Sequence, residues 1–471
     1  MDKNEFRKYG YQIVDWLAEY FEEVEKYPVK SQVKPGDIKA NFSKRPPIEG
    51  EPFDIIFKDF EETILPGVTH WQHPSWFAYF PSNNSPPSVL GELLSAGLGV
   101  QSMIWETSPA AEELEEVVLE WLRQMLGLPE GTEGVIQDTA STATLCALLT
   151  AREEVTNFQT NTYGVGEKTL TVYTSDQTHS SVIKGVRIAG YGDKHIRYIQ
   201  TDEEFSLIPE KLEKAIEEDK REGFTPACVI ATVGTTSSTA IDPLEPIGEI
   251  CKGHNIWFHV DAAFAGAAAL LDEKKSILKG VEFVDSFVFN PHKWLLTNFD
   301  CSAYFVKDSG LLKRTFEIQP EYLKTGVDSQ VKNFRDWGIQ LGRRFRALKL
   351  WFVIRFYGVS GLQKMLREHI RLAMLFKDWV DEDSFFEVMA PVNVSLVCFR
   401  FNDGKSTQQE LDEANRQLLE LVNVTGRAYL THTSLRGHYV IRMAIGQSNT
   451  EEKHVREAWE LIRKKAEFLI N

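Results

Sequence analysis

The chain contains few cysteines, and their spacing excludes two common uses of this residue. Its 471 residues include five cysteines, an odd number, and no two of them form a CxxC pair. A disulfide framework needs paired cysteines and a structural zinc site needs closely spaced ones, so we expect neither. Reduced, widely spaced thiols are typical of a cytoplasmic protein.

Long hydrophobic runs are absent as well. The longest run, from Phe264 to Leu271, has about eight residues, whereas a membrane-spanning helix needs about 20. The polar residues from Met1 to Glu5 are not followed by the apolar core of a signal peptide. We therefore expect a cytoplasmic protein without a membrane partner.

Positive charge is also scarce. Lysine and arginine number 52 against 68 aspartate and glutamate residues, which gives a formal net charge of −16. Nucleic acids and anionic membrane surfaces attract proteins with a basic surface, so neither is an expected partner. A small molecule is the expected ligand.

Composition and pattern predict a globular protein of three parts. With 43% hydrophobic and 25% charged residues, the chain can bury a large core. We expect an N-terminal helical segment over residues 1–85, in which a helix over 4–26 precedes a proline-rich tether. A large domain over 86–348 and a small domain over 349–471 follow. The chain shows no internal repeat and no low-complexity segment.

Strands and helices alternate through the large domain. Strands are expected at residues 169–174, 195–199, 227–233, 256–261, 284–289 and 301–306. Helices are expected at residues 109–126, 140–153, 209–220 and 243–253. This alternation predicts an α/β fold with a mostly parallel sheet between helices. In such sheets ligands bind at the carboxyl ends of the strands.

The pattern changes near residue 346, where a long helical stretch begins. Strands are expected at residues 392–401 and 438–444. Helices are expected at residues 346–358, 362–380, 407–423 and 450–468. This mixture predicts a smaller α+β domain at the C-terminal end.

The segment from Ser286 to Trp294 carries the most informative residue of the chain. An alternating apolar run ends in Asn-Pro-His-Lys293, which places a lysine just beyond a buried strand. A partly desolvated lysine has a lowered pKa and can attack a carbonyl, as Schiff-base lysines do. The alternative is a surface lysine at the end of a strand.

Asp261 ends the strand that precedes Lys293 by about one strand–helix–strand unit. A carboxylate there could face the nitrogen of a cationic heterocycle and keep a pyridine ring protonated, so that the ring accepts electrons. The small residues Ala262 and Ala263 would let a flat ligand approach the backbone. The alternative is an aspartate that caps a helix or a turn.

Two hydroxyl-rich segments suit phosphate binding. Residues 139–144 open a helix with four hydroxyl side chains, at a position where backbone N–H groups bind anions. Residues 234–238 form a second hydroxyl-rich turn after a strand. Ordinary helix capping is the alternative for the first segment. The charge of Asp138 would repel a phosphate unless its side chain points away.

His179 follows another predicted strand, and its imidazole could lie flat over an aromatic ring. The alternative is a structural histidine. Taken together, the sequence places Lys293, Asp261, His179 and two hydroxyl clusters at strand ends of one sheet. These are the parts of a site for pyridoxal 5′-phosphate (PLP).

The chain resembles the PLP-dependent group II decarboxylases, and among them the aromatic L-amino acid decarboxylases, from its first helix to its last. The matching segments begin at Pro66 (PGVTHW), Phe77 (FAYFP), His259 (HVDAA), Asn290 (NPHKWLL), Asn298 (NFDCS) and Leu341 (LGRRFR). The resemblance implies the aspartate-aminotransferase-like fold (fold type I), with a mixed, mostly parallel seven-stranded sheet in the large domain. It also implies a homodimer with shared active sites, in which the N-terminal helices pack across the dimer.

The resemblance assigns roles residue by residue. Lys293 would hold PLP as a Schiff base, Asp261 would pair with the pyridine nitrogen, and His179 would stack on the ring. Further cofactor contacts would come from Ala140, Ser141, Thr236 and Asn290. The substrate cleft would be lined by Trp71, Tyr79, Phe80, Pro81, Ser82, Met103, His179 and Gly342.

Tyr322 matches the family's tyrosine on a mobile loop, which here spans about residues 322–338. The implied reaction is the decarboxylation of an amino acid to an amine and CO₂ by a carboxy-lyase. Tyr322 is the candidate general acid, with His179 as a possible helper. The loop would act as a lid that excludes water, and a plain surface loop is the alternative. Related aldehyde synthases carry Phe at the tyrosine position, or Asn at the histidine position in some insect members, so simple decarboxylation is predicted.

The residues around the predicted cleft favour an aromatic substrate such as tryptophan, tyrosine, phenylalanine or DOPA. The alternative is that several of these aromatic residues belong to the core. Met103 stands where animal relatives tend to have Phe, and Gly342 stands where plant relatives use Gly for indolic and Ser for phenolic substrates. Both residues favour tryptophan or a broad aromatic range. Asp138 and Thr139 replace the Gly-Ser of animal relatives in the phosphate region.

Other readings of the chain stay open at this point. A decarboxylation-dependent aromatic aldehyde synthase and an aminotransferase would share the cofactor, and a non-catalytic binding relative would lack it. The presence of Lys293, Asp261, His179 and Tyr322 together argues against the non-catalytic relative. Arg442 matches the region where aminotransferases of the fold bind the substrate carboxylate, but a structural role is favoured for it here.

Overall fold

The computed structural model describes residues 1–166, 168–318, 320–323 and 325–470. The chain folds into two compact units. The first unit comprises Met1–Pro81, Met374–Met389 and Cys398–Asn471, and the second comprises Ser82–Ala373 and Ala390–Val397. The predicted division into residues 1–85, 86–348 and 349–471 stays a prediction.

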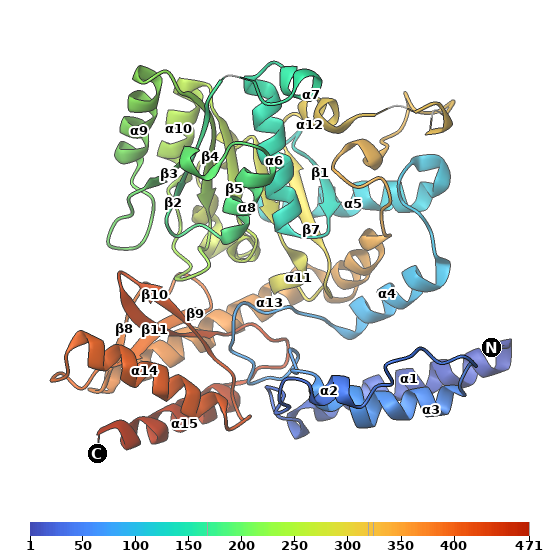
Figure 1. The fold of residues 1–471 in the computed structure, drawn as a ribbon, viewed down its shortest axis with the longest axis vertical. Coiled ribbons are helices and arrows are strands. Elements are labelled where there is room, and N and C mark those ends of the chain that lie inside the picture. Colours follow the sequence, from blue (N-terminus) through green and yellow to red (C-terminus); the bar gives the residue numbers. More distant parts are fainter. Residues whose placement is uncertain (167, 319, 324, 471) are drawn as a thin grey trace. The chain divides into compact units, whose positions relative to one another are not determined.

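A seven-stranded sheet forms the centre of the second unit (Figure 1). Its strands are β1 (Glu133–Gln137), β2 (Leu170–Ser175), β3 (Ile196–Ile199), β4 (Thr225–Thr232), β5 (Trp257–Asp261), β6 (Ser286–Phe289) and β7 (Ser302–Val306). They lie in the order β1-β7-β6-β5-β4-β2-β3, and only β7 runs antiparallel to its neighbours. The predicted mixed, mostly parallel seven-stranded sheet is confirmed.

Helices cover both faces of this sheet, which explains why its central strands read as continuous apolar runs. All residues of β2 and β5 are buried. Helix α6 (Ala140–Val155) packs on β4 to β7 and on α8 (Ser180–Ile188), while α9 (Pro209–Arg221) packs on β3 and β4. Figure 1 shows α9 and α10 (Leu244–His254) on one side of the sheet and α6 and α8 on the other.

A glycine is required where β4 ends. Gly234 has a φ of +88°, and a Cβ atom built on it would lie 2.3 Å from Cβ of Ala265. Only glycine adopts this conformation without strain and leaves room for the neighbouring chain. The hydroxyl-rich turn after β4 therefore lies against the segment that follows Asp261.

The second unit contains several further helices. The α-helices are α4 (Pro86–Leu98), α5 (Pro109–Leu126), α7 (Gln159–Tyr163), α11 (Pro291–Trp294) and α12 (Ser309–Phe316). The 3₁₀ segments are η4 (Trp105–Thr107), η5 (Asp193–His195), η6 (Ala265–Leu270), η7 (Asp272–Leu278), η8 (Val281–Phe283), η9 (Glu321–Leu323) and η10 (Phe334–Asp336). Helix α13 (Arg346–Glu382) begins in the second unit, and its residues from Met374 onward belong to the first unit. It is kinked at Gly358 (φ 64°), between the two helices predicted at 346–358 and 362–380.

A four-stranded sheet in the order β10-β11-β9-β8 belongs to the first unit, except for the first two residues of β9. Its strands are β8 (Phe386–Val388), β9 (Leu396–Phe401), β10 (Thr431–Leu435) and β11 (His438–Ala444). The pairs β8–β9 and β10–β11 are antiparallel. The helical elements of this unit are α1 (Lys3–Glu23), η1 (Val24–Lys26), α2 (Asp37–Ala40), α3 (Phe53–Asp59), η2 (Phe60–Ile64), η3 (Leu65–Gly67), α14 (Gln408–Asn423) and α15 (Glu452–Ile470). The predicted smaller α+β domain is confirmed.

Three observed strands were not expected from the sequence. Strand β1 contains a glycine, β8 has only three residues, and β10 has the polar sequence Thr-His-Thr-Ser-Leu. Strand β8 is too short for its alternation to be recognised, and β1 and β10 lack the apolar run or alternation that identifies a strand. Within the described part of the chain, no helix is both long and apolar enough to cross a membrane.

Candidate functional site

The carboxyl ends of the parallel strands bring the predicted cofactor residues to one edge of the large sheet. Because β1, β2, β4, β5 and β6 run in the same direction, the segments that follow them meet at this edge. They carry Ala140 and Ser141 after β1, His179 after β2, Thr236 after β4, Asp261 at the end of β5, and Asn290 and Lys293 after β6.

Lys293 lies in the short helix α11, directly after β6. Burial lowers the pKa of its amine, and the nearby Asp261 carboxylate acts in the opposite direction. The next residue, Trp294, is fully buried, stacks on Phe264 at 4.9 Å between ring centres, and donates from Nε1 to Nδ1 of His369 at 2.9 Å. These contacts anchor the backbone on which the lysine stands.

Asp261 is buried with 5% of its surface exposed. Its Oδ1 accepts a hydrogen bond from the backbone N–H of Ala263 at 3.0 Å. The strand register places Thr232 beside it, and Thr232 Oγ1 is buried with no hydrogen-bond partner among the described residues. The edge therefore offers a carboxylate and a hydroxyl on neighbouring strands.

His179 caps the N-terminus of α8. Its Nδ1 accepts from the backbone N–H of Ser181 at 3.2 Å and lies 2.7 Å from Ser181 Oγ. The backbone N–H can only donate, so Nδ1 carries no proton and Nε2 carries one. Burial and then the charges of Lys293 and Lys184 lower the pKa of His179, against the opposing effect of Asp261. The ring is neutral, which suits stacking on a flat heterocycle.

The hydroxyl-rich start of α6 is a helix N-terminus capped by Thr139, whose side chain accepts from the backbone N–H of Thr142 at 3.5 Å. Ala140 is buried and Ser141 is exposed. Oδ1 of Asp138 accepts from the backbone N–H of Thr139 at 2.7 Å, and its Oδ2 accepts from Gln340 at 3.4 Å. These contacts occupy both oxygens of the carboxylate that could repel a phosphate.

Asn290 and His292 shape the loop around the lysine. Asn290 is buried, and its Oδ1 accepts from Ser302 Oγ at 2.6 Å. Nδ1 of His292 accepts from the backbone N–H of Cys301 at 2.9 Å, and burial lowers the pKa of His292 to about 3. This neutral histidine, which the sequence did not single out, joins the loop after β6 to the start of β7.

A buried network beneath the site was also missed from the sequence. Ser286 Oγ accepts from Trp257 Nε1 at 2.9 Å and is hydrogen-bonded to Nδ1 of His259 at 2.8 Å. Nε2 of His259 lies 3.4 Å from Thr144 Oγ1 on α6. Side chains alternate along a strand, so His259 and Asp261 share one face of the sheet. This two-residue spacing could have identified His259 from the sequence. The network links β5 to the helix that opens at Thr139.

Tyr322 lies in η9, with 77% of its surface exposed. The structure thus brings it to the surface and not into the cluster around Lys293. The backbone carbonyl of the next residue, Leu323, accepts from Arg335 Nη1 at 2.5 Å. The backbone N–H of Arg335 donates to the backbone carbonyl of Met103 at 3.0 Å. The neighbouring Lys324, part of the predicted lid, lies outside the described residues.

The predicted substrate residues fall in both units. Trp71, Tyr79, Phe80 and Pro81 belong to the first unit, and Ser82, Met103 and Gly342 belong to the second. In the first unit, Trp71 stacks on the buried Trp76 at 4.1 Å, and Tyr79 is half exposed. In the second unit, Met103 is partly buried, and a Cβ atom on Gly342 would lie 3.2 Å from the amide of Gln101.

The residues at the sheet edge fit PLP by the chemistry of their donors and acceptors. The Lys293 amine, whose pKa is lowered, matches the aldehyde of PLP, and the buried Asp261 carboxylate matches its pyridine nitrogen. The neutral His179 imidazole matches the aromatic ring, and the N-terminus of α6 matches the phosphate. Thr178 Oγ1, beside His179, is buried without a hydrogen-bond partner in the described structure and offers a further polar contact.

Comparison with known proteins agrees with this chemistry. Residues 35–402 match the model of the pyridoxal-dependent decarboxylase conserved domain. The chain belongs to the pyridoxal-dependent decarboxylase family. Phenylacetaldehyde synthase of Arabidopsis thaliana is 45% identical, covering 100% of this chain and 98% of the relative, and tyrosine decarboxylase 4 of Petroselinum crispum is 44% identical, covering 100% and 95%.

A solved structure, Oryza sativa TDC with PLP and tryptamine, superposes with a TM-score of 0.97 at 40% identity, covering 100% of this chain and 99% of that one. The present chain is thus a member of the aromatic amino acid decarboxylase family and a carboxy-lyase, and PLP is its cofactor. The fold expected from the resemblance is confirmed by this superposition.

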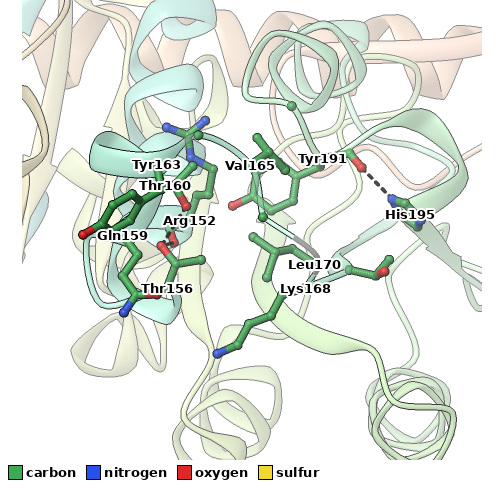
Figure 2. A pocket seen from close by; sticks show the side chains of 14 residues that line it. Arg152, Thr156, Gln159, Thr160, Tyr163, Val165, Lys168, Leu170, Tyr191 and His195 are labelled. Atoms are coloured by element: carbon green, nitrogen blue, oxygen red, sulfur yellow. Dashed lines mark hydrogen bonds between the residues drawn. The ribbon is translucent and has the colours of Figure 1, made fainter.

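A cavity of about 350 Å³ lies elsewhere in the second unit (Figure 2). Its lining includes Leu170, the first residue of β2, and His195, which directly precedes β3, so it lies near the amino ends of these strands. His195 bonds to the backbone carbonyl of Tyr191, and Arg152 bonds to Glu153 and Ala189. The cavity contains none of the predicted site residues.

The buried His259 predicts a pH dependence of stability. Burial lowers its pKa to about 4, whereas an unfolded histidine titrates near 6.5. The unfolded state therefore binds the proton first, and the free energy of unfolding falls as the pH drops from 6.5 to 4 and then levels off, by up to about 3 kcal/mol from this group.

His259→Asn keeps a hydrogen-bonding group for Ser286 and removes the titration. Urea unfolding between pH 4.5 and 7 should give a smaller pH dependence for the variant than for the wild type. Equal slopes for the two proteins would contradict the assignment of a neutral, buried His259.

Proposed function

We propose that this enzyme decarboxylates aromatic L-amino acids to the corresponding arylalkylamines and CO₂. The observation that carries the proposal is the amine of Lys293, with its pKa lowered by burial, at the same sheet edge as Asp261 and His179. The similarity of the chain to both tyrosine decarboxylase 4 of Petroselinum crispum and Oryza sativa TDC supports an aromatic substrate.

PLP, when bound, supplies an electron-accepting ring conjugated to the substrate amine, which makes the bond from Cα to the carboxylate labile. Lys293 would hold the cofactor through its amine, and Asp261 would keep the pyridine nitrogen protonated. His179 would cover one face of the ring. Backbone N–H groups at the start of α6, with Ala140, Ser141, Thr236 and Asn290, would hold the phosphate and orient the ring.

Tyr322 would return a proton to Cα after CO₂ leaves, with the help of His179. Because Tyr322 stands on an exposed turn, delivery of this proton requires the loop to close over the substrate. Closure would also exclude water from the labile carbon.

The aromatic side chain of the substrate would contact Trp71, Tyr79, Phe80 and Pro81, together with Ser82, Met103 and Gly342. Met103 is adaptable in shape, and Gly342 leaves space for a wide ring system. Both residues favour tryptophan, or a broad range of aromatic amino acids, over a single phenolic substrate.

An aromatic aldehyde synthase is the second candidate, because phenylacetaldehyde synthase is among the similar proteins. Such an enzyme consumes oxygen and releases an aldehyde, ammonia and peroxide in place of the amine. The presence of both Tyr322 and His179 favours the amine-forming reaction, since both residues can hold a proton for Cα.

The experiment that tests the proposal measures CO₂, amine and peroxide for tryptophan, tyrosine, phenylalanine and DOPA. We expect one amine per CO₂ and no peroxide from the wild type, with tryptophan among the substrates. Tyr322→Phe removes only the hydroxyl and should lower amine release at least about a hundredfold, the usual worth of a general acid. Peroxide and aldehyde from the wild type would contradict the proposal and support the second candidate.

The proposal includes a homodimer. Four leucines of α4, at positions 90, 93, 94 and 98, recur at helical spacing and are 48%, 55%, 50% and 63% exposed. An apolar stripe of this kind on a helix marks a protein interface, and a second copy of the chain is the partner implied by the family.

Light scattering of the wild type should give twice the mass of one chain. Leu94→Glu should shift the mass toward one chain, because a charge in an apolar interface is costly. Val424→Glu is the matched control at an exposed apolar residue of the first unit and should stay dimeric. A wild type with the mass of a single chain would contradict the dimer.

A further inference from the structure

The segment that carries Tyr79 and Phe80 contains a strained residue. Tyr79 has a φ of +55°, in the left-handed region that bulky side chains rarely adopt. Such a conformation costs about 1–3 kcal/mol and persists only where its surroundings hold it. The contacts around Tyr79 therefore identify the residues that hold it in this conformation.

The segment is attached to the sheet of the first unit on both sides of the turn. Phe77 N–H donates to the carbonyl of Tyr429 at 2.9 Å, and the carbonyl of Phe77 accepts from Ala444 at 3.0 Å. A Cβ atom on Gly446 would lie 2.6 Å from Pro81, so the chain after Phe80 also packs closely on this sheet.

Thr431 holds the strained residue directly. Its Oγ1 accepts from the backbone N–H of Tyr79 at 3.1 Å and from Nη1 of Arg442 at 3.1 Å. Thr431 and Arg442 are opposite residues in the β10–β11 register. The Thr431 hydroxyl thus accepts one hydrogen bond from the turn and another from the arginine.

Arg442 also contacts the residue after Tyr79. Its guanidinium lies 5.3 Å from the ring centre of Phe80, within the range of a cation–π contact. The side chain is 4% exposed, and burial lowers the pKa of Arg442, but a guanidinium keeps its charge in proteins. This buried charge is directed at protein groups on two sides, Thr431 and Phe80.

We propose that Arg442 and Thr431 are positioning residues that fix Tyr79 and Phe80 for contact with the aromatic side chain of the substrate. The inference rests on the proposed function, in which these two aromatic residues contact the substrate. It gives Arg442 a different task from an arginine that binds the substrate carboxylate. A decarboxylase gains nothing from a contact that stabilises this carboxylate in the ground state.

The product amine separates the two roles of Arg442, because it keeps the aromatic side chain of the substrate and lacks the carboxylate. A positioning role predicts that loss of the contact weakens the amino acid and the amine by the same factor. A carboxylate-binding role predicts that only the amino acid is weakened.

The test compares Thr431→Val, which removes the hydroxyl, with Thr431→Ser, which keeps it. Calorimetry on the holoenzyme gives the Kd for tryptamine and phenethylamine, and steady-state kinetics give KM and kcat for tryptophan and phenylalanine. Thr431→Val removes the acceptor of both hydrogen bonds, so it should raise both Kd and KM about fivefold, with kcat within about twofold. Thr431→Ser should stay within about twofold of the wild type.

Arg442→Met adds the second arm, with the melting temperature recorded for every variant. A rise of the amino acid KM with an unchanged amine Kd would overturn the proposal in favour of carboxylate binding. A lower melting temperature with unchanged Kd and KM in Thr431→Val would overturn it in favour of a purely structural role. A wild type that binds the amines but releases no CO₂ would instead contradict the proposed function.

Discussion

The burial of the Lys293 amine near the Asp261 carboxylate is the constraint on which the rest of the site depends. Taking an ammonium out of water favours its neutral form, and a nearby carboxylate limits that effect. The balance leaves an amine of lowered pKa, which is the state that bonds to an aldehyde. A surface lysine at the same point of the sequence would be protonated and unreactive.

The surrounding structure maintains this balance with neutral groups. His179, His259 and His292 each have a pKa lowered mainly by burial, so three imidazoles near the lysine add no positive charge at neutral pH. Trp294 anchors the lysine backbone through His369 and Phe264. Asp261 therefore remains the charged group that acts on both Lys293 and His179.

The gathering of the proposed cofactor residues at one edge of the sheet could be predicted from the sequence. Lys293, Asp261 and His179 each follow or end a buried strand, and parallel strands bring such positions to one edge whatever the details of packing. Six strands of the large sheet and the smaller α+β part were predicted from their apolar runs, which are local signals, whereas the seven-stranded sheet was implied by the family resemblance. Strand β1 was missed because a glycine and polar ends hide its pattern.

Contacts between residues that lie far apart in the sequence could not be predicted. Nothing in the local sequence pairs Trp294 with His369 or Thr431 with both Tyr79 and Arg442, because these residues are brought together by packing and strand pairing. Tyr322 was predicted to lie in a loop, but nothing in the sequence indicated that its side chain is exposed.

The central claim is that the amine of Lys293 holds the cofactor. Reduction of the holoenzyme with borohydride, followed by digestion and mass spectrometry, locates the lysine bonded to PLP. The account predicts the added mass on the peptide that contains Lys293. Added mass on Lys349, a second buried lysine whose pKa burial lowers to about 8, or on any other lysine would contradict it.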